Sequence, residues 1–157
     1  MQGIYTLIIK VNDDMIRFTI RNKEFTLESG IYCYNGSALG KSTNIENRIN
    51  WHLKKQKKVH WHIDRVTVNQ QSEIIQIVFS ESKREIQGEC LVSQEMAKNP
   101  KFTVPIPKFG ASDCKNNCPA HFFKFNSKVN PIDEVLTIYT SLNFSPLLKF
   151  QYPQTHA

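Results

Sequence analysis

Residues 1–40 read MQGIYTLIIKVNDDMIRFTIRNKEFTLESGIYCYNGSALG, and four strand-length runs within them indicate a β-sheet. The runs are rich in Ile, Phe, Tyr and Thr, which pack well on a pleated surface, and they lie at residues 4–9, 16–20, 25–27 and 31–34. Polar turn signals separate the runs at residues 12–14, 22–23 and 29–30. Strands joined by such short connections predict an antiparallel meander.

A helix is predicted directly after this sheet. Thr43-Asn44-Ile45-Glu46 matches a capping box, with a hydroxyl at the cap and a carboxylate three residues later. Ile45, Ile49 and Leu53 recur every four residues, so they share one buried face of the helix. The lysine-rich residues 54–58 then fall at the C-terminal end, where the helix dipole favours positive charge.

The rest of the chain alternates predicted strands and helices. We expect strands at 60–68, 74–79 and 122–125 and helices at 86–98 and 132–142, with 74–79 as a central strand because it is almost continuously apolar. The proline-rich residues 100–120 are expected to be irregular, and the tail beyond Pro153 to be loose. The pattern therefore predicts one α+β domain over residues 1–157, with a mainly antiparallel central sheet flanked by helices.

Composition and charge restrict the classes of function. A chain of 157 residues, with 40% hydrophobic and 22% charged residues, has the composition of a single globular domain and excludes a disordered protein. The longest apolar runs are strand-length, so a transmembrane protein is not expected. The first residues lack the pattern of a signal peptide, which favours a cytoplasmic (intracellular) location. The net charge of +6 favours a polyanionic partner, although charge alone is weak support.

Two tyrosine-containing triplets, Gly3-Ile4-Tyr5 and Tyr34-Asn35-Gly36, lie on predicted strands and precede a helix that carries Arg48 and His52. Glu89 follows on a later predicted helix. This order resembles the GIY-YIG nuclease superfamily, in which a Gly-Ile-Tyr strand and a Tyr-x-Gly strand are followed by a helix with Arg and a helix with a metal-binding Glu.

The resemblance is closer to one branch of that superfamily, catalogued as a domain of unknown function and in some organisms fused to an endonuclease III-like glycosylase. It covers about residues 3–125, which leaves 126–157 as a C-terminal extension. The segments that carry it are YNGSALG at 34–40, RI at 48–49, HL at 52–53, KVHWHID at 58–64, EC at 89–90, FGASDC at 109–114 and CPAHF at 118–122.

Two departures from the superfamily pattern have structural consequences. Asn35 stands where Ile or Val is usual, which is tolerable if its side chain points away from the site. The interval between the two triplets is also long. The predicted strands at 16–20 and 25–27 fit an inserted β-hairpin, which would still allow the two tyrosines to meet.

The resemblance implies a metal-dependent endonuclease that hydrolyses DNA phosphodiester bonds, with a role in DNA repair. Glu89 would hold one Mg²⁺ or Mn²⁺ ion, Arg48 would fork onto phosphate oxygens, and Tyr5 or Tyr34 would accept a proton from water. His52 would contact phosphate or assist proton transfer. The residues alone leave simpler readings open, because the tyrosines could be strand aromatics and Arg48, His52 and Glu89 could be surface groups.

Cys114-x-x-x-Cys118-x-x-His121 is a second constellation, in which three side chains have the compact spacing of zinc ligands. The fourth ligand could be His60, His62, Cys33 or Cys90. Two alternatives remain: the residues could pack a loop over the site, or Cys114 and Cys118 could form a disulfide. An intracellular chain favours thiols or metal ligands.

A basic run and two histidines are candidates for contacts to nucleic acid. The side chains of Lys54, Lys55, Lys57 and Lys58 could touch phosphates, and such contacts carry no sequence information. His60 and His62 would share one face of the predicted strand at 60–68 and could contact phosphate or metal, with Trp61 facing the core. The simpler reading of the lysines is a solvated loop.

The leading prediction is therefore a small nuclease whose partner is DNA, together with a repair glycosylase or another repair protein, and with no membrane. The alternative is a non-catalytic module of the same fold that binds nucleic acid or a repair enzyme. A weaker possibility is a structural partner domain whose charge serves only solubility.

Overall fold

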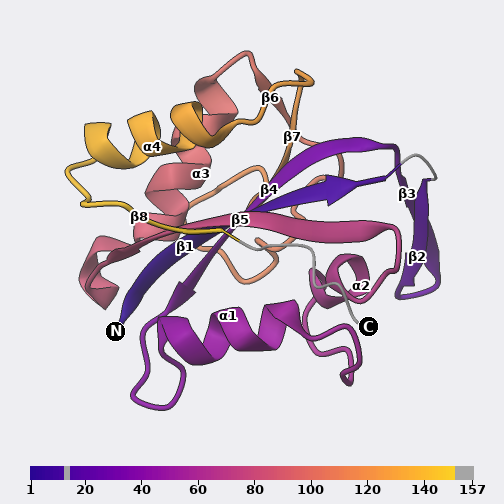
Figure 1. Ribbon diagram of the computed structural model, residues 1–157, viewed down its shortest axis with the longest axis horizontal. Helices are drawn as coiled ribbons and strands as arrows, with labels where there is room; N and C mark the ends of the chain where they lie inside the picture. Colours follow the sequence, from indigo (N-terminus) through magenta and orange to yellow (C-terminus); the bar gives the residue numbers. More distant parts are fainter. Residues whose placement is uncertain (13–14, 151–157) are drawn as a thin grey trace.

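The computed structural model describes residues 1–12 and 15–150 and is built around a six-stranded antiparallel sheet with the order β6-β7-β4-β1-β5-β8 (Figure 1). The strands of this sheet are β1 (Gly3–Val11), β4 (Gly30–Ala38), β5 (Ser72–Glu81), β6 (Phe102–Thr103), β7 (Phe122–Phe125) and β8 (Leu147–Phe150). The predicted α+β class with a mainly antiparallel sheet is confirmed. The predicted central strand is β5, which lies between β1 and β8.

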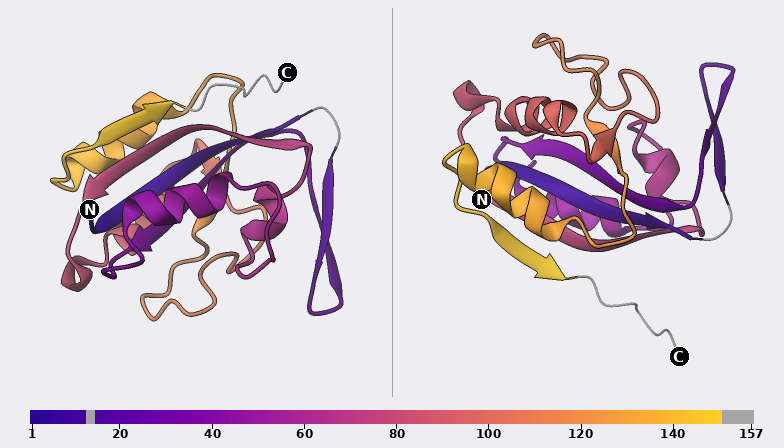
Figure 2. Two further views of the ribbon diagram at one scale, coloured as in Figure 1. Left: turned by 60° about the horizontal axis from the view of Figure 1, so that its bottom comes forward. Right: turned by 90° about the horizontal axis from the view of Figure 1, so that it is seen from above.

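Helices cover both faces of the sheet (Figures 1 and 2). Helices α1 (Ile45–Leu53) and α2 (Asp64–Thr67) lie on one face, and α3 (Gly88–Lys98) and α4 (Ile132–Ser141) lie on the other. A short 3₁₀ turn, η1 (Arg84–Ile86), precedes α3. The helices predicted at 86–98 and 132–142 are thus confirmed within the usual uncertainty of helix ends.

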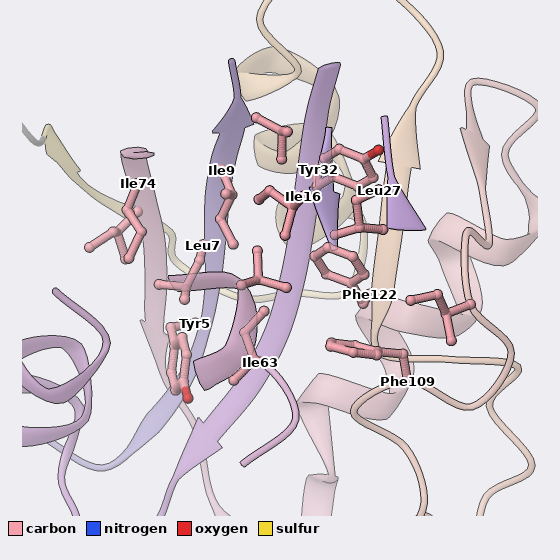
Figure 3. Close-up of a cluster of buried hydrophobic side chains, with 14 of the residues drawn as sticks. Tyr5, Leu7, Ile9, Ile16, Leu27, Tyr32, Ile63, Ile74, Phe109 and Phe122 are labelled. Atoms are coloured by element: carbon pink, nitrogen blue, oxygen red, sulfur yellow. The ribbon is translucent and has the colours of Figure 1, made fainter. Parts of the chain in front are cut away.

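The alternation of side chains along β1 divides the core into two layers. Tyr5, Leu7 and Ile9 point to the face covered by α1 and α2, where Figure 3 shows them in one row. Ile4 and Ile8 point to the opposite face and pack with residues of α3 and α4. The strand is therefore buried on both sides, which explains its nearly continuous apolar sequence.

The predicted meander is wrong, because β1 pairs directly with β4 rather than with the next strand. Strands β2 (Ile16–Ile20) and β3 (Lys23–Leu27) form a separate two-stranded sheet, which stands beside the main sheet in Figure 2. Arg21 and Asn22 both have positive φ, as a tight hairpin turn requires, so this hairpin closes on itself. The inserted hairpin between the two motif strands is therefore confirmed.

Residues 60–68 do not form the predicted strand. The carboxylate of Asp64 accepts hydrogen bonds from the backbone N–H groups of His60 and Trp61, at 2.9 Å each, and α2 begins at Asp64 itself. A side chain that bonds to nearby backbone in this way competes with strand pairing. The expected common face of His60 and His62 disappears with the strand.

Smaller differences concern ends of elements. Helix α1 is capped by Asn44, whose side chain accepts from the N–H of Asn47, so Thr43 is not the cap. Strand β8 was not anticipated from the sequence. The expected turn at Asp13-Asp14 and the expected loose tail beyond Pro153 lie outside the described residues. In the described part of the chain, no helix is long and apolar enough to cross a membrane.

Candidate active site

A cleft of about 350 Å³ lies beside the open part of strand β4. The neighbouring strand β7 pairs only with Ile31–Tyr34, so the edge of β4 is uncovered from Gly36 onward. The cleft brings together four of the five predicted catalytic residues, which are separated by as many as 84 positions between Tyr5 and Glu89: Tyr5, Tyr34, Arg48 and Glu89.

The two motif tyrosines lie side by side on adjacent strands. Their ring planes are parallel within 1°, and the ring centroids are 6.4 Å apart. Gly36 lies opposite Tyr5 in the strand pairing, and a Cβ atom at Gly36 would come within 2.4 Å of the Tyr5 hydroxyl. Glycine at this position therefore leaves the space into which the Tyr5 ring fits.

His52 lies behind Tyr5 rather than in the open cleft. It is buried, and its Nε2 atom is 2.8 Å from the Tyr5 hydroxyl. Burial, together with the positive charge of Lys57, lowers the pKa of His52 to about 3, so the ring is neutral at physiological pH. His52 contacts Tyr5 and does not line the cleft, so direct contact with phosphate is not expected from this position.

Burial raises the pKa of both motif tyrosines. It raises the pKa of Tyr34 to about 12, although the nearby Arg48 guanidinium acts in the opposite direction. The pKa of Tyr5 lies well above its ordinary value for the same reason, with a further contribution from Tyr34. Tyr34 is half-buried and its hydroxyl is not engaged by His52, so it is the better placed of the two to accept a proton.

Arg48 is held at the cleft by a stack that the sequence did not reveal. Its guanidinium carbon lies 4.3 Å from the centre of the Trp61 ring, within the range of a cation–π contact. Trp61 is fixed in turn by Asp64, which is fully buried and binds the Trp61 backbone and the Trp51 indole N–H. Trp61 is therefore a platform for Arg48 and not only a core residue.

The residue Asn35 borders the cleft, but its side chain points to the opposite face of the sheet, the orientation in which Asn is tolerable at this position. Its amide accepts from Thr6 at 2.7 Å and donates to Ser93 at 3.0 Å, and Thr6 also bonds to the Tyr139 hydroxyl. These partners lie on the opposite side of the sheet from Tyr5 and Tyr34, where α3 and α4 pack. The polar side chain is thus satisfied inside the second core layer.

Glu89 lies in the first turn of α3 and reaches the same cleft. Its Oε2 atom is buried and has no hydrogen-bond partner among the described residues. Burying a carboxylate oxygen without a hydrogen-bond donor costs free energy unless a cation or a water molecule satisfies the oxygen. The atom is therefore suited to hold a hard divalent ion.

Four side chains form a compact cluster, of which all but Cys118 line the cleft: Cys90, Cys114, Cys118 and His121. Their ligand atoms all lie within 4.8 Å of one another, so the cluster could hold a metal ion. Cys90, one of the four suggested fourth ligands, joins the predicted trio, whereas Cys33, His60 and His62 do not. All four cysteines of the chain are free thiols, so the alternative disulfide is not formed.

The predicted phosphate-binding lysines divide into two kinds. The ammonium of Lys57 donates to the Trp51 carbonyl and pairs with buried Asp64, and its side chain is 2% exposed. Lys55 donates to the carbonyl oxygens of Asn69 and Ser72. These two side chains are engaged within the protein, whereas the ammonium groups of exposed Lys54 and Lys58 form no hydrogen bond or ion pair with the described residues.

The chain belongs to the family described as "Domain of unknown function DUF123", which matches residues 4–144. No curated protein and no solved structure matches this chain. Sequence reasoning missed the role of Asp64 and the role of Trp61 as a platform, and it named Cys90 only as one of four possible fourth ligands. Only Cys90 carried a local signal, because it adjoins Glu89 at a predicted helix start.

Proposed function

We propose that this protein is a metal-dependent endonuclease that hydrolyses phosphodiester bonds in DNA. The observation that carries the proposal is the convergence of Tyr5, Tyr34, Arg48 and Glu89 on one cleft. This set offers a proton acceptor, a forked cation for phosphate and a carboxylate for a divalent ion. The resemblance to the GIY-YIG nucleases predicts the same roles for the same residues.

Glu89 would hold a Mg²⁺ or Mn²⁺ ion, because its buried Oε2 atom lacks a partner among the described residues. When bound, the ion supplies positive charge that stabilises the negative charge developing on the phosphate. Carboxylate oxygen is the ligand that these hard ions prefer.

The remaining roles follow from position. Tyr34 accepts the proton of the attacking water, since its hydroxyl is free of His52 and Arg48 counteracts the rise in its pKa. Arg48, held against Trp61, binds phosphate oxygens through its planar guanidinium. His52 is a positioning residue that orients Tyr5 through the 2.8 Å hydrogen bond.

The Tyr34→Phe variant tests the proton acceptor. It should keep the strand packing and lose about a hundredfold in cleavage rate. Because the pKa of Tyr34 is raised to about 12, its reactive phenolate becomes more populated as pH rises, and the wild-type rate should increase up to tenfold per pH unit below that value. Cleavage rates measured from pH 6.5 to 9 check both effects. If the cleavage rate of Tyr34→Phe rises with pH as steeply as that of the wild-type protein, Tyr34 is excluded as the base.

Zinc is the metal that the cysteine cluster fits best, because three thiolates and one imidazole form a common tetrahedral zinc site. Cys90 belongs to α3, whereas Cys114, Cys118 and His121 belong to the loop that precedes β7. A zinc ion here would tie that irregular loop to the helix that presents Glu89. Its role would be structural, because all four positions are taken by protein ligands.

Lys54 and Lys58, whose ammonium groups are not engaged with the described residues, should contact the DNA backbone. Replacing Lys54 and Lys58 by Gln should weaken binding to duplexes of any sequence and reduce the salt slope of the affinity by about 2. Lys57→Gln is the contrasting variant, because it removes a partner of buried Asp64 and should lower stability. Fluorescence anisotropy at several salt concentrations, with thermal unfolding, measures both. An unchanged salt slope in the double variant would show that these lysines do not contact DNA and are part of a solvated loop.

The overall proposal is tested with a panel of duplex, nicked, flapped, branched and single-stranded DNA in the presence of Mg²⁺ or Mn²⁺. Cleavage of any of these that depends on Glu89 supports a nuclease, and a branched or flapped preference supports a role in repair. Salt-sensitive binding without cleavage under every metal would favour the alternative, a non-catalytic module that holds nucleic acid or a repair enzyme.

A further inference from the structure

A second cavity lies between the β2–β3 hairpin and the loop at residues 106–112, with a volume of about 300 Å³. We call it the hairpin pocket and define its wall by six residues: Ile20, Phe25, His62, Ile106, Pro107 and Phe109. None of its wall residues except His62 belongs to the candidate sites predicted from the sequence. The volume is at the lower end of the range for pockets that bind small organic groups.

Half of the wall of the hairpin pocket is aromatic, because Phe25, His62 and Phe109 carry aromatic rings. Phe25 packs at 5.9 Å from Phe18, which in turn lies 6.0 Å from Phe109, with both distances between ring centroids. His62 lies 5.9 Å from Phe109. Partial burial and the cations Arg65 and Arg21 lower the pKa of His62, so its ring is neutral at physiological pH. Such a wall offers flat faces for stacking.

The hairpin pocket is also lined by positively charged side chains. Arg21, Lys23 and Lys108 all line it, and the pocket wall includes no carboxylate among the described residues. Lys108 also donates to the Cys118 carbonyl, and the Lys23 ammonium lies 5.4 Å from the Phe25 ring centre. Neither Arg21 nor Lys23 forms an ion pair with any residue that the structure describes. An aromatic wall beneath unpaired cations suits a planar ring attached to a phosphate.

The hairpin pocket and the active-site cleft share a wall. Trp61 and Gly110 line the cleft, whereas their immediate neighbours His62 and Phe109 line the hairpin pocket. Two short segments of the chain, residues 61–62 and 109–110, therefore contribute to both cavities. A strand whose phosphate lies beside Arg48 in the cleft would therefore run next to the hairpin pocket.

We propose that the hairpin pocket binds an unpaired nucleobase of the DNA strand that lies in the active-site cleft. The proposal rests on the proposed function for the strand's position and adds the class of substrate, which is DNA with an unpaired base next to the scissile phosphate. Base stacking on aromatic side chains tolerates every base, because each has a flat π-face. The pocket thus selects an unpaired base and not a sequence.

The experiment compares two DNA duplexes that differ in one group. The first carries a single unpaired adenine, and the second carries an abasic residue at that position, so both have the same number of phosphates and the same interruption. Binding is measured by fluorescence anisotropy with the Glu89→Gln protein, so that cleavage does not interfere. The base-bearing duplex should bind about tenfold more tightly, the effect of one stacked base. Equal affinities would overturn the proposal.

Two variants identify the pocket as the source of the difference. Phe25→Leu keeps an apolar side chain but removes the flat ring, so the ratio of the two affinities should fall toward one. Phe144→Leu makes the same change at a separate cavity beside Met1 and should keep the ratio. Lys23→Gln should weaken both duplexes equally, because phosphate contacts do not depend on the base. Thermal denaturation checks that Phe25→Leu is folded. If the folded variant retains the full ratio of the two DNA affinities, the base binds elsewhere.

These measurements separate the two proposals. Base discrimination without cleavage by the wild-type protein would reject the nuclease and retain the pocket in a nucleic-acid-binding module. Cleavage with equal affinities for the two duplexes would retain the nuclease and reject the pocket. A ligand of another class, such as an aromatic side chain of a partner protein, would also leave the two DNA affinities equal.

Discussion

Glu89→Gln should reduce cleavage by at least about a thousandfold while DNA binding stays within about twofold. The amide keeps the size of the side chain but loses the charge that would hold the divalent ion. Loss of several kcal/mol of charge stabilisation at the phosphate corresponds to about three powers of ten in rate. Binding should survive because it depends on the basic surface, which lies outside this contact.

The measurement is a Mg²⁺-dependent cleavage assay with anisotropy on the same DNA. Glu95→Gln is the matched control, since Glu95 lies on the same helix but is partly exposed, pairs with Lys98 and does not line the cleft. It should cut like the wild-type protein. Full activity in Glu89→Gln would show that the cleavage comes from another site or from a contaminant, and equal losses in both variants would indicate damage to α3.

The second large effect is expected from the cysteine cluster. Protein purified without added metal should contain about one zinc per chain, and Cys118→Ser should lose it and unfold at a temperature lower by more than about 10 °C. Structural zinc sites contribute about 10 kcal/mol or more of apparent binding free energy, and 1 kcal/mol shifts the Tm of a chain of this size by about 2–4 °C. Cys118 is fully buried within the cluster, so a serine hydroxyl cannot take its place.

Elemental analysis and thermal unfolding, with and without a chelator, measure this effect. Cys33→Ala is the matched control, because Cys33 is equally buried but lies in the second core layer, away from the cluster. That variant should keep its zinc and lose only packing energy. A metal-free wild-type protein that is stable and has four reduced thiols would reject the zinc centre. Cys114, Cys118 and His121 would then belong to a loop that only packs over the active-site cleft.

Much of the architecture follows from local sequence patterns. The alternation at 16–20, the turn signal at 22–23 and the four-residue repeat of Ile45, Ile49 and Leu53 act over short distances, so the hairpin and α1 could be predicted, although the turn itself lies one residue earlier, at Arg21 and Asn22. The four cleft residues can also be predicted, but only because their order resembles a known superfamily. Taken singly, each resembled an ordinary strand aromatic or surface group.

Local patterns failed where one side chain reorganises its surroundings. Asp64 binds the backbone of His60 and Trp61 and pairs with Lys57, and these contacts replace the predicted strand by a turn and a helix. The spacing of Asp64 and Lys57 in the sequence carries no sign of the pair. Likewise, nothing in the lysine run distinguishes buried Lys57 from exposed Lys54 and Lys58.

The sequence alone determined which chemical groups are present and which of them share a strand or a helix face. Only the tertiary structure decided that β1 pairs with β4 across the inserted hairpin, that Cys90 and not Cys33 completes the cluster, and that Trp61 supports Arg48. These contacts join residues far apart in the chain. Their free energy depends on strand pairing and on burial between layers, which appear only when distant segments are packed together.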